Sequence, residues 1–182
     1  MRILYVTTIS NTVNAFLVPH IKLLMEKGHQ VDVAFNIVKE PSTELKKLGC
    51  KIYNIEFQRS PLSKKNVFAY KKLKNLIKKQ KYDLVHTHTP VASACVRLAC
   101  RNLKNVKVMY TAHGFHFYKG ASLKNWMFFY PIEKWLSNYT DCLITINSED
   151  YYVARNKMRA CSTKLVSGVG IDLEKFKPLN VV

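Results

Sequence analysis

Short apolar runs alternate with helix-like segments along nearly the whole chain. Runs rich in β-branched and apolar residues, which are typical of strands, occupy residues 2–8, 30–35, 50–57, 82–88, 106–113, 141–147 and 164–167. Segments with apolar residues at helical spacing lie between them, at residues 12–27, 41–48, 63–80, 90–103, 122–138 and 148–158. Strands that alternate with helices in this way predict an α/β fold, a Rossmann-like open parallel sheet with helices on both faces.

The length of the chain fits one domain. With 182 residues, of which 48% are hydrophobic, it can build one well-packed core but not two of ordinary size. We expect this domain to span residues 1–167. The remaining segment, residues 168–182, contains two glycines and a proline and has no apolar periodicity, so it is predicted to begin a linker that leads out of the domain.

Several simple classes of protein do not fit the sequence. No stretch has the roughly 18 consecutive apolar residues of a membrane-spanning helix, and the first residues, MRILYVTT, lack the features of a signal peptide. The five cysteines show no CxxC or other metal-type spacing, so neither a zinc ribbon nor a disulfide framework is expected. We therefore expect a cytoplasmic protein with buried free thiols.

The charge of the chain predicts an anionic partner. The sequence has 29 Lys and Arg against 12 Asp and Glu, which gives a net charge of +17. Residues 59–81 hold nine of the positive side chains and no acidic one. Ala69, Leu73, Leu76 and Ile77 form an apolar stripe there, which fits a crossover helix that packs on the core with its lysines in solvent. The alternative is a helix that faces an anionic membrane surface.

A second segment, residues 125–139, is rich in aromatic residues. It is predicted to be a buried or partly buried helix, although such aromatic residues also suit an interface with lipid headgroups. The basic segment at 59–81 has few aromatic residues on which bases could stack, and the chain carries no helix-turn-helix, RNP or finger signature. Nucleic acid is therefore not an expected partner.

Polar side chains gather where the predicted strands end, and sheets of this type bind ligands at the carboxyl ends of their strands. Four of the six histidines lie there. Any one of them could be a structural residue that is hydrogen-bonded locally, but the set as a whole predicts a binding cleft. The candidate residues are Thr8, Asn11 and Asn14 after the first strand, His86 and His88 at the fourth, His113, Gly114, His116 and Lys119 after the fifth, and Asn147 and Glu149 after the sixth.

The two histidine pairs could also suggest a metal site, because imidazoles are common zinc ligands. No acidic residue lies near either pair and no HExxH pattern occurs, so metal binding is the minor alternative. Gly114 instead lets the backbone approach a ligand closely, and the imidazole of His113 beside it can donate to a sugar hydroxyl or a phosphate. The first turn, TTISNTVNAF, contains no glycine and is not a dinucleotide fingerprint, although its helix amides could hold an anion.

Five segments together, EKGHQVDVAF, YDLVHTHTP, YTAHGFHFYKGA, TDCLITINSED and GVGIDLEKF, resemble the N-terminal half of family 4 glycosyltransferases of the GT-B fold. The likeness is to bacterial enzymes of capsular and exopolysaccharide synthesis in particular. It implies the acceptor-side domain of a retaining enzyme that moves a sugar from a nucleotide-sugar to a saccharide or polyprenyl-diphosphate-linked acceptor at the inner face of the membrane. The nucleotide-sugar domain is expected to lie outside this sequence, so the isolated domain should be inactive.

The resemblance also implies roles for individual residues. His113 would be the catalytic residue that reaches the donor sugar, and the other candidates would bind substrates, with Lys119 or the basic segment drawing the acceptor diphosphate. Gly168 and Gly170 would lie at the interdomain connection. No metal or other cofactor is implied, and the absence of a carboxylate at the first, fourth and fifth strand ends favours a front-face displacement. His20 is expected on a helix away from the cleft.

Two other functions stay open. A non-catalytic subunit that supplies a membrane or acceptor site to a separate catalytic chain would share every motif. A basic α/β domain that binds nucleic acid would predict salt-sensitive, sequence-independent binding.

Overall fold

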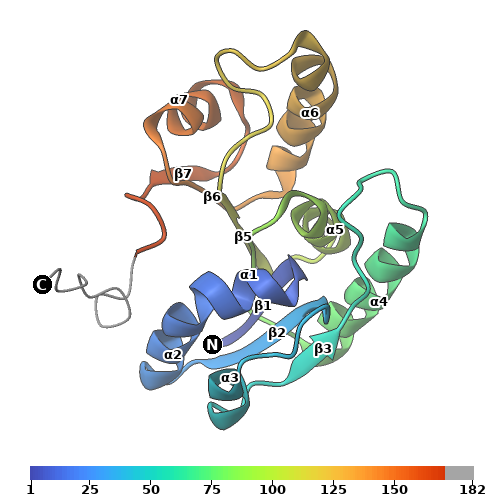
Figure 1. The fold of residues 1–182 in the computed structure, drawn as a ribbon, viewed down its shortest axis with the longest axis vertical. Coiled ribbons are helices and arrows are strands. Elements are labelled where there is room, and N and C mark those ends of the chain that lie inside the picture. Colours follow the sequence, from blue (N-terminus) through green and yellow to red (C-terminus); the bar gives the residue numbers. More distant parts are fainter. Residues whose placement is uncertain (171–182) are drawn as a thin grey trace, which may run out of the picture.

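Seven parallel strands form one sheet in the computed structural model of the chain, which describes residues 1–170 (Figure 1). Their order across the sheet is β3-β2-β1-β4-β5-β6-β7. The order changes direction between β1 and β4, and open α/β sheets bind ligands at such a switch point. The predicted Rossmann-like fold is confirmed. The strands are β1 (Arg2–Ile9), β2 (Gln30–Asn36), β3 (Ile52–Asn54), β4 (Leu84–Thr87), β5 (Lys107–Ala112), β6 (Cys142–Thr145) and β7 (Ser162–Leu165).

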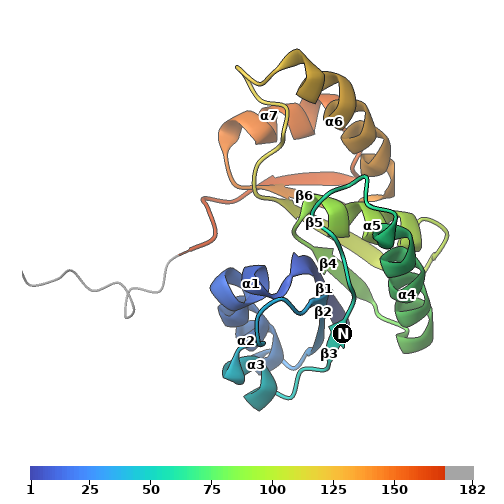
Figure 2. The ribbon, with the colours of Figure 1, turned by 45° about the vertical axis from the view of Figure 1, so that its right-hand side comes forward.

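Helices cover both faces of the sheet (Figures 1 and 2). Helices α2 and α3 lie on one side, and α4 and α5 lie on the other and contact each other along their length. Right-handed crossovers between parallel strands require this arrangement. The helices are α1 (Ser10–Thr12), the π-helical turn η1 (Val13–Leu17), α2 (Val18–Glu26), α3 (Thr43–Lys47), α4 (Lys65–Gln80), α5 (Pro90–Cys100), α6 (Leu123–Leu136), the 3-10 turn η2 (Ser137–Tyr139) and α7 (Ser148–Lys157).

The central strand β1 is apolar on both faces because helices cover both of them. Leu4 and Val6 belong to the core cluster on the α4 and α5 side, and Ile3 and Tyr5 belong to the cluster on the α2 side. The apolar stripe predicted for residues 59–81 also packs as expected, since Ala69, Leu73 and Ile77 of α4 are buried and Leu76 is partly buried. These contacts fix the strand ends at the switch point.

On one face of the sheet, the strands β4, β5 and β6 are only partly covered by the other described residues. Along β4 and β6 buried residues alternate with half-buried ones, and β5 does the same around its Met109. Neighbouring strands pair His86 with Met109 and Met109 with Cys142, so these half-buried side chains form a row on one face. The row runs from β4, beside the switch point, across β5 to β6.

The observed elements differ from the predicted ones at a few places. The helix predicted at residues 12–27 is interrupted by η1, because Pro19 lacks the N–H that a regular helix would use there. The strand predicted at residues 50–57 is only three residues long in β3, since Phe57 N–H turns back to the Ile55 carbonyl. Gly168 and Gly170 both have positive φ, of 81° and 78°. The rest of the predicted linker, residues 171–182, lies outside the described residues.

The described residues include no helix with the length and apolar character needed to cross a membrane. The five cysteines are free thiols. Cys50, Cys95 and Cys100 are buried, whereas Cys142 is half-buried and Cys161 is exposed, so the expectation of buried thiols holds for only three of them.

Candidate functional site

The histidines at the ends of β4 and β5 meet beside the switch point. His88 Nδ1 lies 3.2 Å from His113 Nε2. The ring centroids of His86 and His88 are 4.2 Å apart, and the Tyr5 ring stacks on the His88 ring at 5.5 Å. His86 Nε2 lies 2.9 Å from Thr111 Oγ1, on the neighbouring strand. We call Tyr5, His86, His88 and His113 the histidine cluster; it contains three of the predicted site residues.

Burial keeps the histidine cluster uncharged at neutral pH. Burial, followed by the charges of His20 and His113, lowers the pKa of His86 to about 3. Burial and the neighbouring histidines hold the pKa of His88 well below its usual value. His113 is exposed as a residue, but partial burial of its ring among its neighbours still lowers its pKa. Burial raises the pKa of the Tyr5 hydroxyl to about 12. The three imidazoles are therefore neutral hydrogen-bonding groups rather than cations.

Two buried side-chain atoms here have no hydrogen-bond partner among residues 1–170, namely His88 Nε2 and Thr87 Oγ1. Buried polar atoms are nearly always paired in proteins, so this region departs from the usual rule. In the described part of the chain, no group of three or more His, Cys, Asp or Glu side chains is placed to hold a metal ion. The cluster is thus built from imidazoles in contact with one another and with aromatic and hydroxyl groups.

The loop that follows His113 is fixed by the start of α7. Gly114 has a φ of 141°, which favours glycine, and lets the chain turn directly after the histidine. The Phe115 amide donates to Asp150 Oδ2 at 3.1 Å, and the Asn147 side chain donates to the same oxygen at 2.8 Å. Asn147 also caps α7 by accepting from the Asp150 amide. Asp150 is a positioning residue that the candidate set omitted, and its place three residues after a capping asparagine was the available signal.

The other candidates of this loop are exposed. The His116 ring stacks on Phe129 of α6, with centroids 4.6 Å apart. Lys119 donates its backbone amide to the Glu149 carboxylate, which ties the far end of the loop to α7. Asn147 and Glu149 therefore hold the loop that carries His113, and neither of them joins the histidine cluster.

The candidates after β1 are largely used in internal bonds. The Thr8 amide and hydroxyl bond to Thr89 Oγ1 at 2.8 and 2.7 Å. Asn14 donates to the Glu40 carbonyl and accepts from the Ser42 amide, both at 3.0 Å. Asn11 is exposed, and no hydrogen bond of its side chain is found among residues 1–170. This turn is therefore tied to two neighbouring segments.

His20 is exposed on α2, and its Nδ1 lies 3.0 Å from the Phe16 carbonyl oxygen. No contact between His20 and the cluster is found among residues 1–170, but its charge is among the causes that lower the pKa values of His86 and His88. The expectation that His20 lies on a helix away from the cleft therefore stays a prediction.

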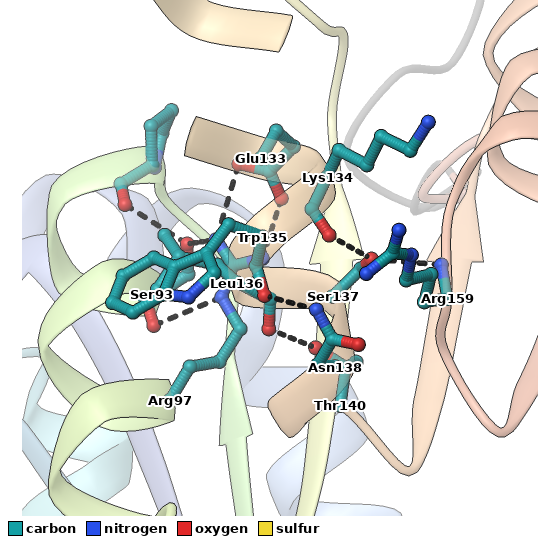
Figure 3. A network of polar contacts seen from close by, with 11 residues as sticks. Ser93, Arg97, Glu133, Lys134, Trp135, Leu136, Ser137, Asn138, Thr140 and Arg159 are labelled. Atoms are coloured by element: carbon teal, nitrogen blue, oxygen red, sulfur yellow. Dashed lines mark hydrogen bonds and ion pairs between the residues drawn. The ribbon is translucent and has the colours of Figure 1, made fainter. Parts of the chain in front are cut away.

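A buried ion pair that the candidate set omitted joins α5 to α6 (Figure 3). Arg97 is fully buried and bonds both carboxylate oxygens of Glu133, at 2.5 and 3.1 Å. Its guanidinium also donates to Ser93 and lies 4.6 Å from the Tyr110 ring centroid. The two charged residues are 36 positions apart, on helices whose packing no local pattern predicts.

The chain matches the Glycosyl transferase 4-like family over residues 2–147. It is 43% identical over 185 residues to EpsD of Bacillus subtilis (strain 168), a protein named as a glycosyltransferase, covering 100% of this chain and 47% of that protein. It is 34% identical over 127 residues to an Escherichia coli UDP-Gal:alpha-D-GlcNAc-diphosphoundecaprenol alpha-1,3-galactosyltransferase, covering 63% of this chain and 31% of that protein. The chain thus spans less than half the length of these relatives.

Among solved structures, the S. aureus MnaA–UDP structure matches with a TM-score of 0.71 and 13% identity, covering 100% of this chain and 48% of that chain. At this identity the likeness concerns the fold alone. Since the family match covers most of the chain and the EpsD match covers all of it, this chain belongs to the glycosyl transferase 4-like family of GT-B glycosyltransferases.

Proposed function

We propose that this chain is the acceptor-side half of a retaining glycosyltransferase. The enzyme moves a sugar from a nucleotide-sugar to a saccharide or polyprenyl-diphosphate-linked acceptor in surface polysaccharide synthesis. The observation that carries the proposal is the neutral, partly unpaired histidine cluster at the sheet's switch point in a chain of this family. The E. coli relative's name specifies a UDP-galactose donor and a diphosphoundecaprenol-linked acceptor, which supports this acceptor class.

In this proposal His113 is the catalytic residue that positions the donor sugar and stabilises the negative charge that develops on the departing phosphate. It is exposed at the end of β5, and Gly114 leaves the backbone beside it accessible to a ligand. A neutral imidazole N–H aimed at a developing negative charge stabilises the transition state without reorganising during the reaction. His116, Lys119 and Asn11 are exposed around the same ends of the sheet and would contact the substrates.

The carboxylates beside the loop support a front-face displacement. A double displacement would need an accessible carboxylate nucleophile. Asp150 is buried and accepts two hydrogen bonds, and Glu149 is engaged by the Lys119 amide. Both carboxylates hold the loop in place, so neither is placed as a free nucleophile.

The parent protein that contains this chain tests the proposal. Purified full-length protein should transfer a sugar from a nucleotide-sugar to a polyprenyl-diphosphate-linked saccharide, and NMR of the new linkage should show the anomeric configuration of the donor. Residues 1–182 alone should transfer none. Inversion of configuration would overturn the retaining mechanism, and inactivity of the parent with every nucleotide-sugar and lipid-linked acceptor tried would favour a non-catalytic subunit.

We also propose that the protein sits on the cytoplasmic face of an anionic membrane. Eight of the nine basic side chains of residues 59–81 are exposed, and the ninth, Lys74, is half-buried. Leu62 and Phe68, in the same segment, are 91% and 72% exposed. Basic residues next to exposed apolar ones suit a surface of anionic headgroups over hydrocarbon.

Helix α6 adds a second apolar surface to the same helical layer. Only Leu136 of its 14 residues is buried and several others are half-buried, so α6 is the partly buried helix among the predicted alternatives. Trp126, Phe129 and Tyr130 turn toward the core. The outward residues recur at i, i+3 and i+4 spacing and are Leu123, Met127, Phe128, Ile132 and Trp135. A row of five exposed large apolar side chains on one helix indicates an interaction surface.

Vesicle binding tests this location. Binding to vesicles with anionic lipid should exceed binding to neutral ones and fade as salt rises. The double variant Lys71→Gln with Lys78→Gln should weaken binding by about 2 kcal/mol, roughly thirtyfold. The control is Lys22→Gln with Lys27→Gln at α2, on the other side of the sheet. Equal, salt-independent binding to both kinds of vesicle would remove the membrane from the proposal.

A further inference from the structure

The contact between His88 and His113 can form with the hydrogen on either of the two facing nitrogen atoms. His88 Nδ1 and His113 Nε2 are 3.2 Å apart, and each nitrogen can donate or accept. Both rings are neutral at neutral pH, so one hydrogen lies between them and each ring has one other nitrogen. The placement of that hydrogen decides which group His113 offers to a substrate.

The surroundings of His88 favour one placement. The ring is 5% exposed, stacked on Tyr5, and its Nε2 has no partner among residues 1–170. A hydrogen on Nε2 would leave a buried N–H donor unpaired, which is rarer in proteins than an unpaired acceptor. A hydrogen on Nδ1 would be used in the bond to His113 and leave only a lone pair unpaired. The His88 hydrogen therefore belongs on Nδ1.

We propose that His88 is a positioning residue that donates from Nδ1 to His113 Nε2 and so holds His113 as the neutral tautomer with its hydrogen on Nδ1. His113 then presents Nδ1–H, a hydrogen-bond donor, to a sugar or phosphate oxygen. The catalytic meaning of this arrangement rests on the proposed function, whereas the tautomer itself does not.

The same bond opposes protonation of His113, because Nε2 is already engaged as an acceptor. The other titratable groups around the cluster are Tyr5 of β1, His86 of β4 and His20 of α2. Tyr5 stays protonated across the physiological range because burial raises its pKa to about 12. Removal of His88 should therefore let the pKa of His113 rise toward the ordinary value.

NMR of the 182-residue chain with ¹⁵N-labelled histidine tests the proposal without any substrate. Long-range ¹H–¹⁵N correlations should show His113 with its hydrogen on Nδ1. In His88→Leu the His113 hydrogen should move to Nε2, the form that free imidazole side chains prefer, and its pKa should rise. His88→Asn, whose amide N–H₂ can take the place of Nδ1–H, should restore the original tautomer.

The matched control is His86→Leu, which removes a neighbouring imidazole that bonds Thr111 rather than His113. It should leave the His113 tautomer unchanged. Wild-type His113 with its hydrogen on Nε2, or an unchanged tautomer in folded His88→Leu, would overturn the proposal. If His88→Leu does not fold, the wild-type spectrum and His88→Asn decide. Loss of sugar transfer in the parent enzyme is a separate measurement, so failure of the proposed function would be seen independently.

Discussion

The end of β1 and the ends of β4 and β5 meet at the same switch point, yet their polar side chains are used differently. After β1, Ser10 exchanges hydrogen bonds with Lys39, and Asn14 bonds the backbone at two positions of the next loop. At β4 and β5, a buried imidazole nitrogen is unpaired among the described residues and His113 is exposed. Polar side chains at strand ends are thus tied to neighbouring segments on one side, whereas on the other side one imidazole nitrogen is unpaired among the described residues and His113 is exposed.

The largest effect that we predict from this difference is on the rate of sugar transfer. His113→Ala in the full-length enzyme should reduce the rate of transfer about a hundredfold, or about 3 kcal/mol, because one preorganised donor is lost. Its melting temperature should fall by only a few degrees, since the residue is exposed and the bond to His88 is the one hydrogen bond of its side chain found among residues 1–170. Initial rates measured beside thermal unfolding check this.

The control for that variant is His29→Ala. His29 lies near the amino terminus of the chain, where its Nδ1 is 3.4 Å from the terminal amine. His20 is unsuitable because its charge is among the causes that lower the pKa of His86. Near-normal transfer by His113→Ala, or a loss of rate matched by unfolding, would show that His113 is not catalytic. The polar side chains at β4 and β5 would then be structural, like those after β1.

A smaller effect is expected on stability in acid. The pKa of His86 is lowered on folding, so the unfolded chain binds more protons below pH 6.5 and stability falls as the pH drops toward about 3. For this residue the loss is about 1.4 kcal/mol per pH unit below 6.5. Urea unfolding of wild type and His86→Leu at pH 7.5 and 5.5 measures it. The variant should lose less stability than the wild type over this interval; an equal loss would show that the cluster does not disfavour the proton.

An effect of similar size tests the β1 side. Asn14→Ala should lower stability by about 1–2 kcal/mol because two hydrogen bonds are lost, which corresponds to a fall in melting temperature of roughly 2–8 °C for a chain of this size. Asn11→Ala, at an exposed position in the same turn, should leave the melting temperature unchanged. A stable Asn14→Ala variant with a raised KM in the full-length enzyme would instead make Asn14 a substrate residue.

The sequence predicts the fold well because its periodicity reflects burial. β1 and β2 are mostly apolar and continuously buried in their interiors since both their faces are covered, and Ala69, Leu73 and Ile77 recur at helical spacing because α4 has one buried face. Boundaries are less predictable where a local irregularity intervenes, as at η1 before Pro19.

The candidate site is predictable only in part, because the strand-end rule selects positions but not partners. His86, His88 and His113 could be placed at neighbouring strand ends, but their mutual contacts depend on the register of β4 against β5. Asn14 and Asn147 also follow strand ends, but their side chains form hydrogen bonds with nearby backbone groups instead. Arg97 could not be distinguished from a surface arginine, because its partner Glu133 lies on another helix.

The Arg97–Glu133 pair has a consequence for how α6 can move. A helix held only by apolar side chains can roll about its own axis, since such contacts have no preferred direction. Two hydrogen bonds from a planar guanidinium to one carboxylate have a preferred direction, so they hold Glu133 in one orientation relative to Arg97. The ion pair therefore restrains rotation of α6 about its axis. The exposed apolar residues of the helix, from Leu123 to Trp135, cannot rotate into the protein core while the pair is intact. The apolar side chains remain exposed to solvent because an ion pair on the opposite side of the helix restrains its rotation.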